Sequence, residues 1–292
     1  MEEGRGDMGT RRLRSLGWVA GALALVGCGD HLLPAGTGCE QGESGGALEE
    51  VEQPWLLAID EDEGKLDALV QISLVPGAEG EVTVLCEELE LPSELPGDTN
   101  FTSLAVHEGR LFASALRETW GDTLVEIDPC TCSVELVGDY GFTLVSGLAS
   151  GPEGLLGVAA EGDWLMRVDP ADASSSVLAA LDADWGSNAL SASVGGELAY
   201  GLDASEDRLY TLRVSDGAVL GSIALADPFL AAGLELHGEV GELYACGVEG
   251  LDRDLFVLDP LTGAAELVAA EVFMTRCDNL AAPSGPIACV SD

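Results

Sequence analysis

A short phrase returns at regular intervals along this chain, and it limits the fold more than any other feature. The phrase is Leu, two variable residues, an apolar residue and Asp, and it stands at 124–128, 165–169 and 255–259. Weaker copies begin at Leu69 and Leu209, so successive copies start 55, 41, 44 and 46 residues apart. This period is typical of the four-stranded blades of a β-propeller.

Each copy stands in the same order of short apolar stretches. A stretch of small residues such as 103–106 comes first, and a second stretch such as 111–113 follows after a turn. The phrase is then the third strand, and an alternating stretch such as 134–137 is the fourth. Small residues suit the first strand, because the innermost strands crowd around the propeller axis. The 38 glycines and the aromatic content of 5% fit short strands joined by tight turns.

In three copies the phrase ends in Asp followed by Pro, at the turn into the fourth strand, and Asp216-Gly217 stands at the same turn after the copy at Leu209. Asp bonds to nearby backbone amides and Pro presets φ, so both residues favour β-turns. Because an acid recurs at this turn in four of the five copies, we expect it to be structural and not part of a site.

Counting the stretches predicts an all-β propeller of five blades, with six as the alternative. Five first strands are centred on Leu104, Leu148, Leu190, Leu234 and Leu280, but the first blade, which begins near Trp55, has none of its own. We therefore expect the C-terminal strand to complete the N-terminal blade and close the ring.

The N-terminus has the order of a bacterial lipoprotein signal. Three arginines precede an apolar run from Leu16 to Gly27, which is too short to span a bilayer. The run ends Leu25-Val26-Gly27-Cys28, which resembles a lipobox, and this resemblance implies cleavage before Cys28 and lipidation of Cys28. Gly29 follows in place of the Asp that retains some lipoproteins at the inner membrane, so the expected location is the cell envelope of a Gram-negative bacterium, at the outer membrane or cell surface.

These signals divide the chain into three parts. Residues 1–27 are the expected signal peptide, and 28–53 form a Gly-rich, acidic tether without periodicity. The propeller is expected over 54–292.

Two stretches carry a resemblance to a known group of proteins. Leu-Val-Glu-Ile-Asp-Pro at 124–129 and Leu-Phe-Val-Leu-Asp-Pro-Leu-Thr-Gly at 255–263 look like repeats of extracellular bacterial β-propellers of the YVTN and quinoprotein-like type. The resemblance implies fold and not chemistry, because that group contains binding scaffolds, surface proteins and enzymes. No quinone-cofactor motif of the group is recognisable in this sequence.

The charge of the chain restricts its partners. The 52 acidic residues against 12 basic ones give a formal charge of −40, spread along the sequence. Such a surface repels phosphate backbones, so we expect no nucleic-acid partner. The expected partners are the membrane, through the lipid anchor, and a protein, small-molecule or glycan ligand. No cofactor is identified, and calcium is the one that the sequence leaves open.

An exported chain with eight cysteines favours disulfides. Cys277 and Cys289 flank a turn at 283–285, and we predict a bridge between them across a final hairpin. A bond from Cys86 to Cys130 or Cys132 is an open alternative for the other thiols.

The loops that lead into the first strands are the expected ligand site. They share aromatic, carboxylate and amide side chains, and the predicted contacts are Tyr140, Trp185, Phe229, Asp184, Asn188, Asp278 and Asn279. The alternative for the aromatic residues is that they fill gaps between blades.

Two classes of function follow. The preferred one is a lipoprotein whose propeller is a non-catalytic scaffold for a ligand or protein. The alternative is a propeller enzyme, either a metal-dependent lactonase or a glycan-active hydrolase, that uses acids at the channel mouth. No common hydrolase, nucleotide or metalloprotease motif is present, so no catalytic residue is predicted.

Overall fold

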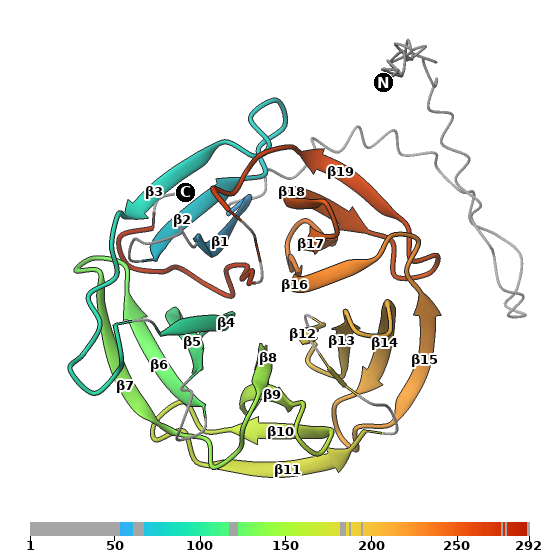
Figure 1. The fold of residues 1–292 in the computed structure, drawn as a ribbon, viewed down its shortest axis with the longest axis horizontal. Coiled ribbons are helices and arrows are strands. Elements are labelled where there is room, and N and C mark those ends of the chain that lie inside the picture. The colour runs from blue at the N-terminus through green and yellow to red at the C-terminus, as the bar shows by residue number, and fades with distance from the viewer. Residues whose placement is uncertain are drawn as a thin grey trace, which may run out of the picture. The chain divides into compact units, whose positions relative to one another are not determined.

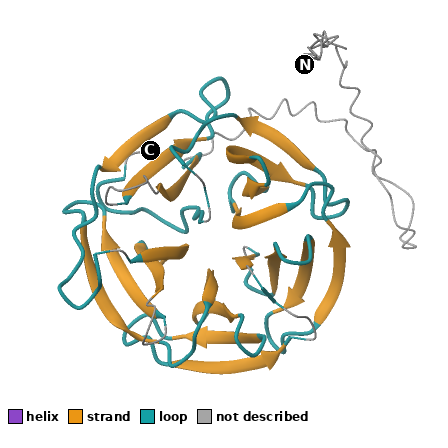
Figure 2. Ribbon diagram, viewed as in Figure 1, coloured by secondary structure: helices purple, strands orange, loops and turns teal. Residues whose placement is uncertain are grey.

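The computed structural model describes residues 53–60, 67–97, 99–116, 122–181, 185–186, 188–193, 195–275, 277 and 279–290. Every regular element in these ranges is a β-strand (Figure 2). No helix in this part of the chain is long and apolar enough to cross a membrane.

The strands form five antiparallel sheets arranged in a ring as the blades of a propeller (Figure 1). Blade 1 holds β1 (Trp55–Asp60), β2 (Ala68–Ser73) and β3 (Val82–Cys86). Blade 2 holds β4 (Asn100–His107), β5 (Arg110–Leu116), β6 (Thr123–Asp128) and β7 (Ser133–Asp139). Blade 3 holds β8 (Val145–Gly151), β9 (Gly154–Ala159), β10 (Trp164–Val168) and β11 (Ser175–Ala180).

Blade 4 holds β12 (Asn188–Ala192), β13 (Leu198–Asp203), β14 (Arg208–Arg213) and β15 (Val219–Ala224). Blade 5 holds β16 (Phe229–Leu236), β17 (Leu243–Val248), β18 (Leu251–Leu258) and β19 (Ala265–Ala269). All five copies of the Leu-x-x-apolar-Asp phrase therefore fall on the strand next to the outermost one, namely β2, β6, β10, β14 and β18. In a blade of four strands this is the third. The prediction of a five-bladed all-β propeller is confirmed.

Ring closure uses the C-terminal segment, but only a short part of it pairs. Ala281 forms an antiparallel bridge with Leu57 of β1, with N–H to O=C distances of 2.8 and 2.9 Å in the two directions. The segment thus takes the innermost place in blade 1. Residues 287–289, which resemble a further second strand in sequence, are not a strand.

Disulfides hold this closing segment at both ends. Cys277 is bonded to Cys246 of β17, and Cys289 is bonded to Cys130 in the turn between β6 and β7. The predicted bridge between Cys277 and Cys289 is therefore wrong. Cys277 and Cys289 are not bonded to each other because the segment crosses blade 1 from blade 5 to blade 2 and does not fold back as a hairpin. The two thiols therefore lie beside different blades.

A third disulfide, between Cys86 of β3 and Cys132, joins blade 1 to blade 2. It corresponds to one of the alternatives left open by the sequence. It is reinforced by a parallel bridge in which Glu90 N–H donates to the Cys132 carbonyl at 2.8 Å and Val134 N–H donates to the Glu90 carbonyl at 3.0 Å. All three disulfides thus lie at the seam where the ring begins and ends.

The core is divided among the interfaces between blades. Each of five buried clusters draws its side chains from two adjacent blades, as when Leu57 and Ile59 of blade 1 pack with Leu104 and Val125 of blade 2. A blade therefore buries its two faces against its two neighbours.

Candidate functional site

The propeller has two faces, which we name by their connections. The turn face carries the turns between first and second strands and between third and fourth strands. The loop face carries the turns between second and third strands and the loops that lead into each following blade. Among the predicted ligand residues, Tyr140 and Trp185 lie in such loops and Phe229 begins β16 on this face.

The predicted aromatic contacts are buried side chains between blades. Tyr140, Trp185 and Phe229 are 3%, 1% and 3% exposed. The Trp185 ring lies 4.8 Å from the Tyr210 ring, measured between centroids, and a Cβ at position 201 would come within 2.5 Å of it, so Gly201 makes room for the indole. These rings offer no surface to a ligand and have the gap-filling role that was the alternative for them.

Acids near the loop face hold the backbone of the incoming loops. Asp163 accepts the N–H of Trp185 at 2.9 Å, and Asp207 accepts the N–H of Phe229 at 3.0 Å. Asp122 accepts the N–H of Val145 in the same way, and burial raises the pKa of this carboxyl to about 6. These three carboxylates fix each loop to the blade before it.

This bond was missed at the sequence level, although the sequence contains a signal for it. An Asp stands two residues before the first leucine of the phrase in four copies, at 67, 122, 163 and 207. The last copy has Arg253 there, and its Nε donates to the carbonyl of Phe273 at 2.7 Å. At three of these four positions, 122, 163 and 207, the Asp holds the loop that enters the next blade, so an acid two residues before the leucine of the phrase indicates loop anchoring.

Asn279 is 2% exposed and belongs to the ring closure. Its Oδ1 accepts the N–H of Ile59 at 2.7 Å, and its Nδ2 donates to the carbonyl of the same residue at 3.3 Å. The side-chain amide extends the single bridge at Ala281 by one more pair of bonds. Cys28, Asp184 and Asp278 lie outside the described residues, as does the side chain of Asn188.

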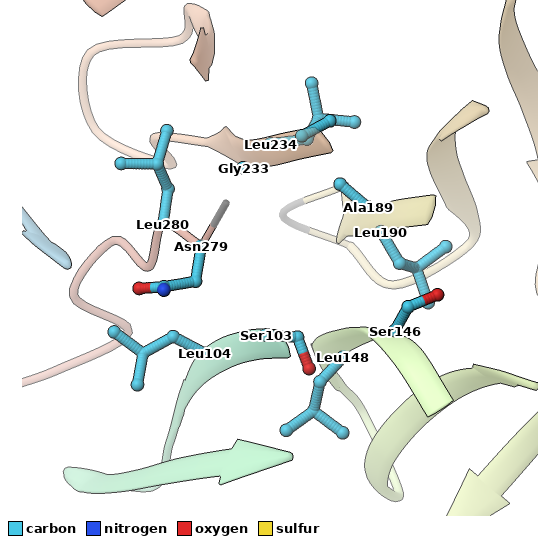
Figure 3. A pocket seen from close by; sticks show the side chains of 11 residues that line it. Ser103, Leu104, Ser146, Leu148, Ala189, Leu190, Gly233, Leu234, Asn279 and Leu280 are labelled. Atoms are coloured by element: carbon cyan, nitrogen blue, oxygen red, sulfur yellow. The ribbon is translucent and has the colours of Figure 1, made fainter. Parts of the chain in front are cut away.

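A small cavity lies where the five innermost segments meet, and its water-accessible volume is about 10 Å³ (Figure 3). Its wall includes the leucines on which the first strands are centred, Leu104, Leu148, Leu190, Leu234 and Leu280, and residues that precede them. The leucine side chains point outward, away from the centre of the view, so backbone and small groups line the centre. This layer leaves room for about one water molecule at the axis.

Glu235 of β16 is an ionisable group on the innermost layer that sequence reasoning missed. At the corresponding place, one residue after the central leucine, the other first strands have Ala105, Ala149, Ser191 and Ala281. The Glu235 carboxyl is bonded to the N–H of Ala282 and to the Ser191 hydroxyl, which itself accepts the N–H of Leu236 at 2.7 Å. Part of the side chain is exposed, yet close protein walls desolvate it and raise its pKa to about 8.

Two histidines occupy equivalent places on the turn face and differ in their surroundings. His237 is fully buried, and its ring bonds to the carbonyl of Gln53 at 2.8 Å and to the N–H of Val240 at 3.2 Å. Desolvation lowers the pKa of His237. His107 is 9% exposed, and its Nδ1 lies 3.0 Å from the Ser150 hydroxyl of the next blade.

A groove opens on the turn face between blades 2 and 3. It offers about 800 Å³, including the part open to solvent. Its walls are polar and consist of His107, Glu108, Glu153, Gly154, Arg167, Asp169, Pro170 and Ser174, Ser175 and Ser176. No three His, Cys, Asp or Glu side chains in the described ranges lie close enough together to hold a metal ion.

Comparison with known proteins shows the fold alone. No family model matches the chain, and no curated protein matches it in sequence. A chain from a nidogen/laminin complex is 10% identical with a TM-score of 0.53, and the match covers 78% of this chain and 97% of that one. A Bacteroides thetaiotaomicron protein of unknown function is 15% identical with a TM-score of 0.50, over 81% of this chain and 63% of that one.

A further solved structure, TolB from Acinetobacter baumannii, is 12% identical with a TM-score of 0.47, and the match covers 76% of this chain and 54% of that one. At these identities the common feature is the β-propeller, which hosts many unrelated functions. A function for this chain must be argued from its own residues.

Proposed function

We propose that this chain is an exported lipoprotein, held at the cell envelope of a Gram-negative bacterium through Cys28, whose propeller is a non-catalytic scaffold that binds a protein or small ligand. The observation that carries the proposal is the set of three disulfides at the seam. Structural disulfides persist in oxidising compartments and are rare in the bacterial cytosol. Together with the lipobox-like Leu25-Val26-Gly27-Cys28, they support export.

The binding role draws on the build of the propeller and on its neighbours. The buried aromatics and the anchored loops make a rigid body, and rigid elements position binding groups accurately. The YVTN-like repeats agree with an extracellular propeller, and the nidogen/laminin chain shows that a similar fold can be found in a complex with another protein.

The enzyme alternative has one observation in its favour. Glu235 has a pKa of about 8, and strongly shifted acids are enriched at catalytic sites. However, its bonds to Ala282 and Ser191 join the closing segment to blades 4 and 5, which gives the shift a structural cause. Scaffold therefore remains the proposal, and hydrolase or lactonase the second candidate.

The anchoring part can be tested with two cysteine variants of the full chain, expressed in a Gram-negative host. We expect Cys28→Ala to move the protein from the membrane fraction to the soluble periplasmic fraction and to abolish metabolic labelling by an alkyne fatty acid. Cys39→Ala is the matched control and should stay labelled and membrane-bound. A Cys28→Ala protein that remained in the membrane fraction would contradict the proposal.

A further inference from the structure

The groove between blades 2 and 3 is the feature that neither the ring closure nor the loop anchoring explains. One wall is the turn of blade 2 that contains His107 and Glu108, and the other consists of the two turns of blade 3. Its lining contains no Phe, Tyr or Trp ring and no large apolar side chain. Small-molecule sites are usually enclosed and mostly apolar, so an open, polar groove suits a side chain or segment of a larger partner better.

The charges around this groove favour a cation. The two arginines nearby already have acidic partners, because Arg167 pairs with Glu153 at 2.7 Å and Arg110 pairs with Glu126. Glu108 and Asp169 line the groove as well, and within the described residues neither forms a salt bridge. Four acids against two arginines leave a local formal charge of −2, in a chain whose total of −40 adds long-range attraction for cations.

His107 supplies a second and independent indication of a ligand. The side chain is nine-tenths buried, and it lines the groove. Its Nδ1 is taken by the Ser150 hydroxyl, while its Nε2 has no hydrogen-bond partner among the described residues. When Nδ1 carries the proton and donates to Ser150, Nε2 is left as a hydrogen-bond acceptor.

We propose that this groove binds the lysine side chains of a basic segment of a partner protein. This rests on the proposed scaffold function and names the chemistry of its partner. A lysine ammonium group has three N–H donors and no acceptor, and the Glu108 and Asp169 carboxylates and the His107 ring line the groove as acceptors for successive lysines. The neighbouring hydroxyls of Ser174 and Ser176 can receive the polar backbone of the same segment.

The test uses the detergent-solubilised full chain and an acetylated, amidated tetralysine peptide, titrated calorimetrically at low ionic strength. The groove variant is Glu108→Gln with Asp169→Asn, which keeps the shape of both side chains. Asn also keeps the acceptor that holds the N–H of Ala171, now 2.8 Å from Asp169. We expect the affinity for tetralysine to fall about tenfold, equivalent to about 1.4 kcal/mol.

The matched control makes the same change of charge in blade 5. Asp259 holds the N–H of Leu261 at 2.8 Å in the corresponding turn, and Glu266 is exposed on β19. Asp259→Asn with Glu266→Gln should change the affinity less than twofold. An equal fall in both double variants would mean diffuse attraction to an acidic surface, and the proposal would be overturned, as it would by wild-type protein that does not bind the peptide.

A second measurement follows the histidines, of which the chain has only three. In protein labelled at histidine with ¹⁵N, tetralysine should shift the imidazole signals of His107 and leave those of buried His237 unchanged. An unshifted His107, or a neutral chitotriose that shifts it equally, would refute the lysine assignment. Failure here leaves the membrane anchoring by Cys28 untouched, so the two proposals fail separately.

Discussion

At the scale of single residues, Glu235 on the innermost strand of blade 5 makes the stability of the propeller depend on pH. Its pKa rises from an ordinary 4.5 to about 8 in the folded protein, so the folded state binds a proton more strongly than the unfolded state. The stability from this group is fully present below pH 4.5 and is lost as the pH rises towards 8. The stability that Glu235 contributes at low pH exceeds its contribution at high pH by at most about 5 kcal/mol, at 1.36 kcal/mol per pKa unit.

Glu235→Gln should therefore stabilise the protein at pH 9 by a few kcal/mol and have little effect at pH 4.5. The Gln side chain stays neutral while its oxygen can still accept from Ala282 and Ser191. Urea unfolding at several pH values measures the effect, with the exposed Glu266→Gln as the control. If the two variants follow the same pH dependence, desolvation of Glu235 is not the cause.

Residues with a left-handed backbone mark how neighbouring blades touch. One such residue follows the third strand of every blade, namely Gly80, Cys132, Ala173, Gly217 and Gly263. A Cβ at Gly217 would overlap the Cβ of Ala179 in blade 3, and one at Gly80 would overlap Ala269 of blade 5. In blade 2 the position is Cys132, and the disulfide to Cys86 replaces this close contact with a covalent one.

Three glycine variants separate backbone strain from collision. Gly217→Ala combines φ of +65° with the overlap and should cost about 2 to 4 kcal/mol of unfolding free energy. Gly141→Ala has φ of +75° in open space and should cost about 1 kcal/mol. Gly221→Ala has neither feature and should be neutral within about 0.5 kcal/mol. Any other order in chemical denaturation would contradict the contact argument.

The repeat phrase predicted much of the fold for a physical reason that also marks its limit. The Asp at the end of the third strand bonds locally, as when Asp128 accepts the N–H of Cys130 at 2.8 Å, so its role can be inferred from its neighbours in sequence. Pairings such as Cys130 with Cys289, 159 residues apart, depend on where the whole ring brings the chain. The burial of Tyr140, Trp185 and Phe229 depends on the facing blade for the same reason, and one sequence does not determine it.

At the scale of elements, the outer strands show how the propeller protects its free edges. Each fourth strand has a β-bulge, which leaves one of its residues without a partner on the third strand. In four blades the bulge lies beside the first leucine of the phrase. In β15 it lies between the partners of Thr211 and Leu212, nearer the turn. A bulge twists an edge and hinders pairing with another chain, so the repeated bulge opposes aggregation through exposed strands.

The closing segment pairs with β1 through one backbone bridge, Leu57 with Ala281, and through the side chain of Asn279. Because Asn279 bonds both backbone groups of Ile59, Asn279→Asp should remove the donor and set a carboxylate against a carbonyl oxygen. We expect a loss of about 2 to 4 kcal/mol, larger than for Asn279→Ala, since the acid adds a buried charge. Denaturant unfolding at neutral pH compares the two, and an Asp variant as stable as wild type would remove Asn279 from the closure.

At the scale of the whole molecule, the ring depends on the covalent seam. Disulfides that close longer loops restrict the unfolded chain more, and the loops of Cys130–Cys289 and Cys246–Cys277 are 159 and 31 residues. The loop-entropy relation gives about 5 and about 4 kcal/mol. We expect the double variant Cys130→Ser with Cys289→Ser to lose more unfolding free energy than the double variant Cys246→Ser with Cys277→Ser.

The combined variant, with all four of these cysteines changed to Ser, tests closure itself. Once both ends of the closing segment are free, the bridge between Leu57 and Ala281 and the amide of Asn279 must hold it alone. Hydrogen exchange should then accelerate first in β1 and in residues 279–282, while β9 and β10 of blade 3, opposite the seam, keep their protection. Cys39→Ser is the control and should exchange like wild type. Uniform acceleration around the ring would mean that the blades unfold together and that the disulfides stabilise the propeller without acting as its clasp.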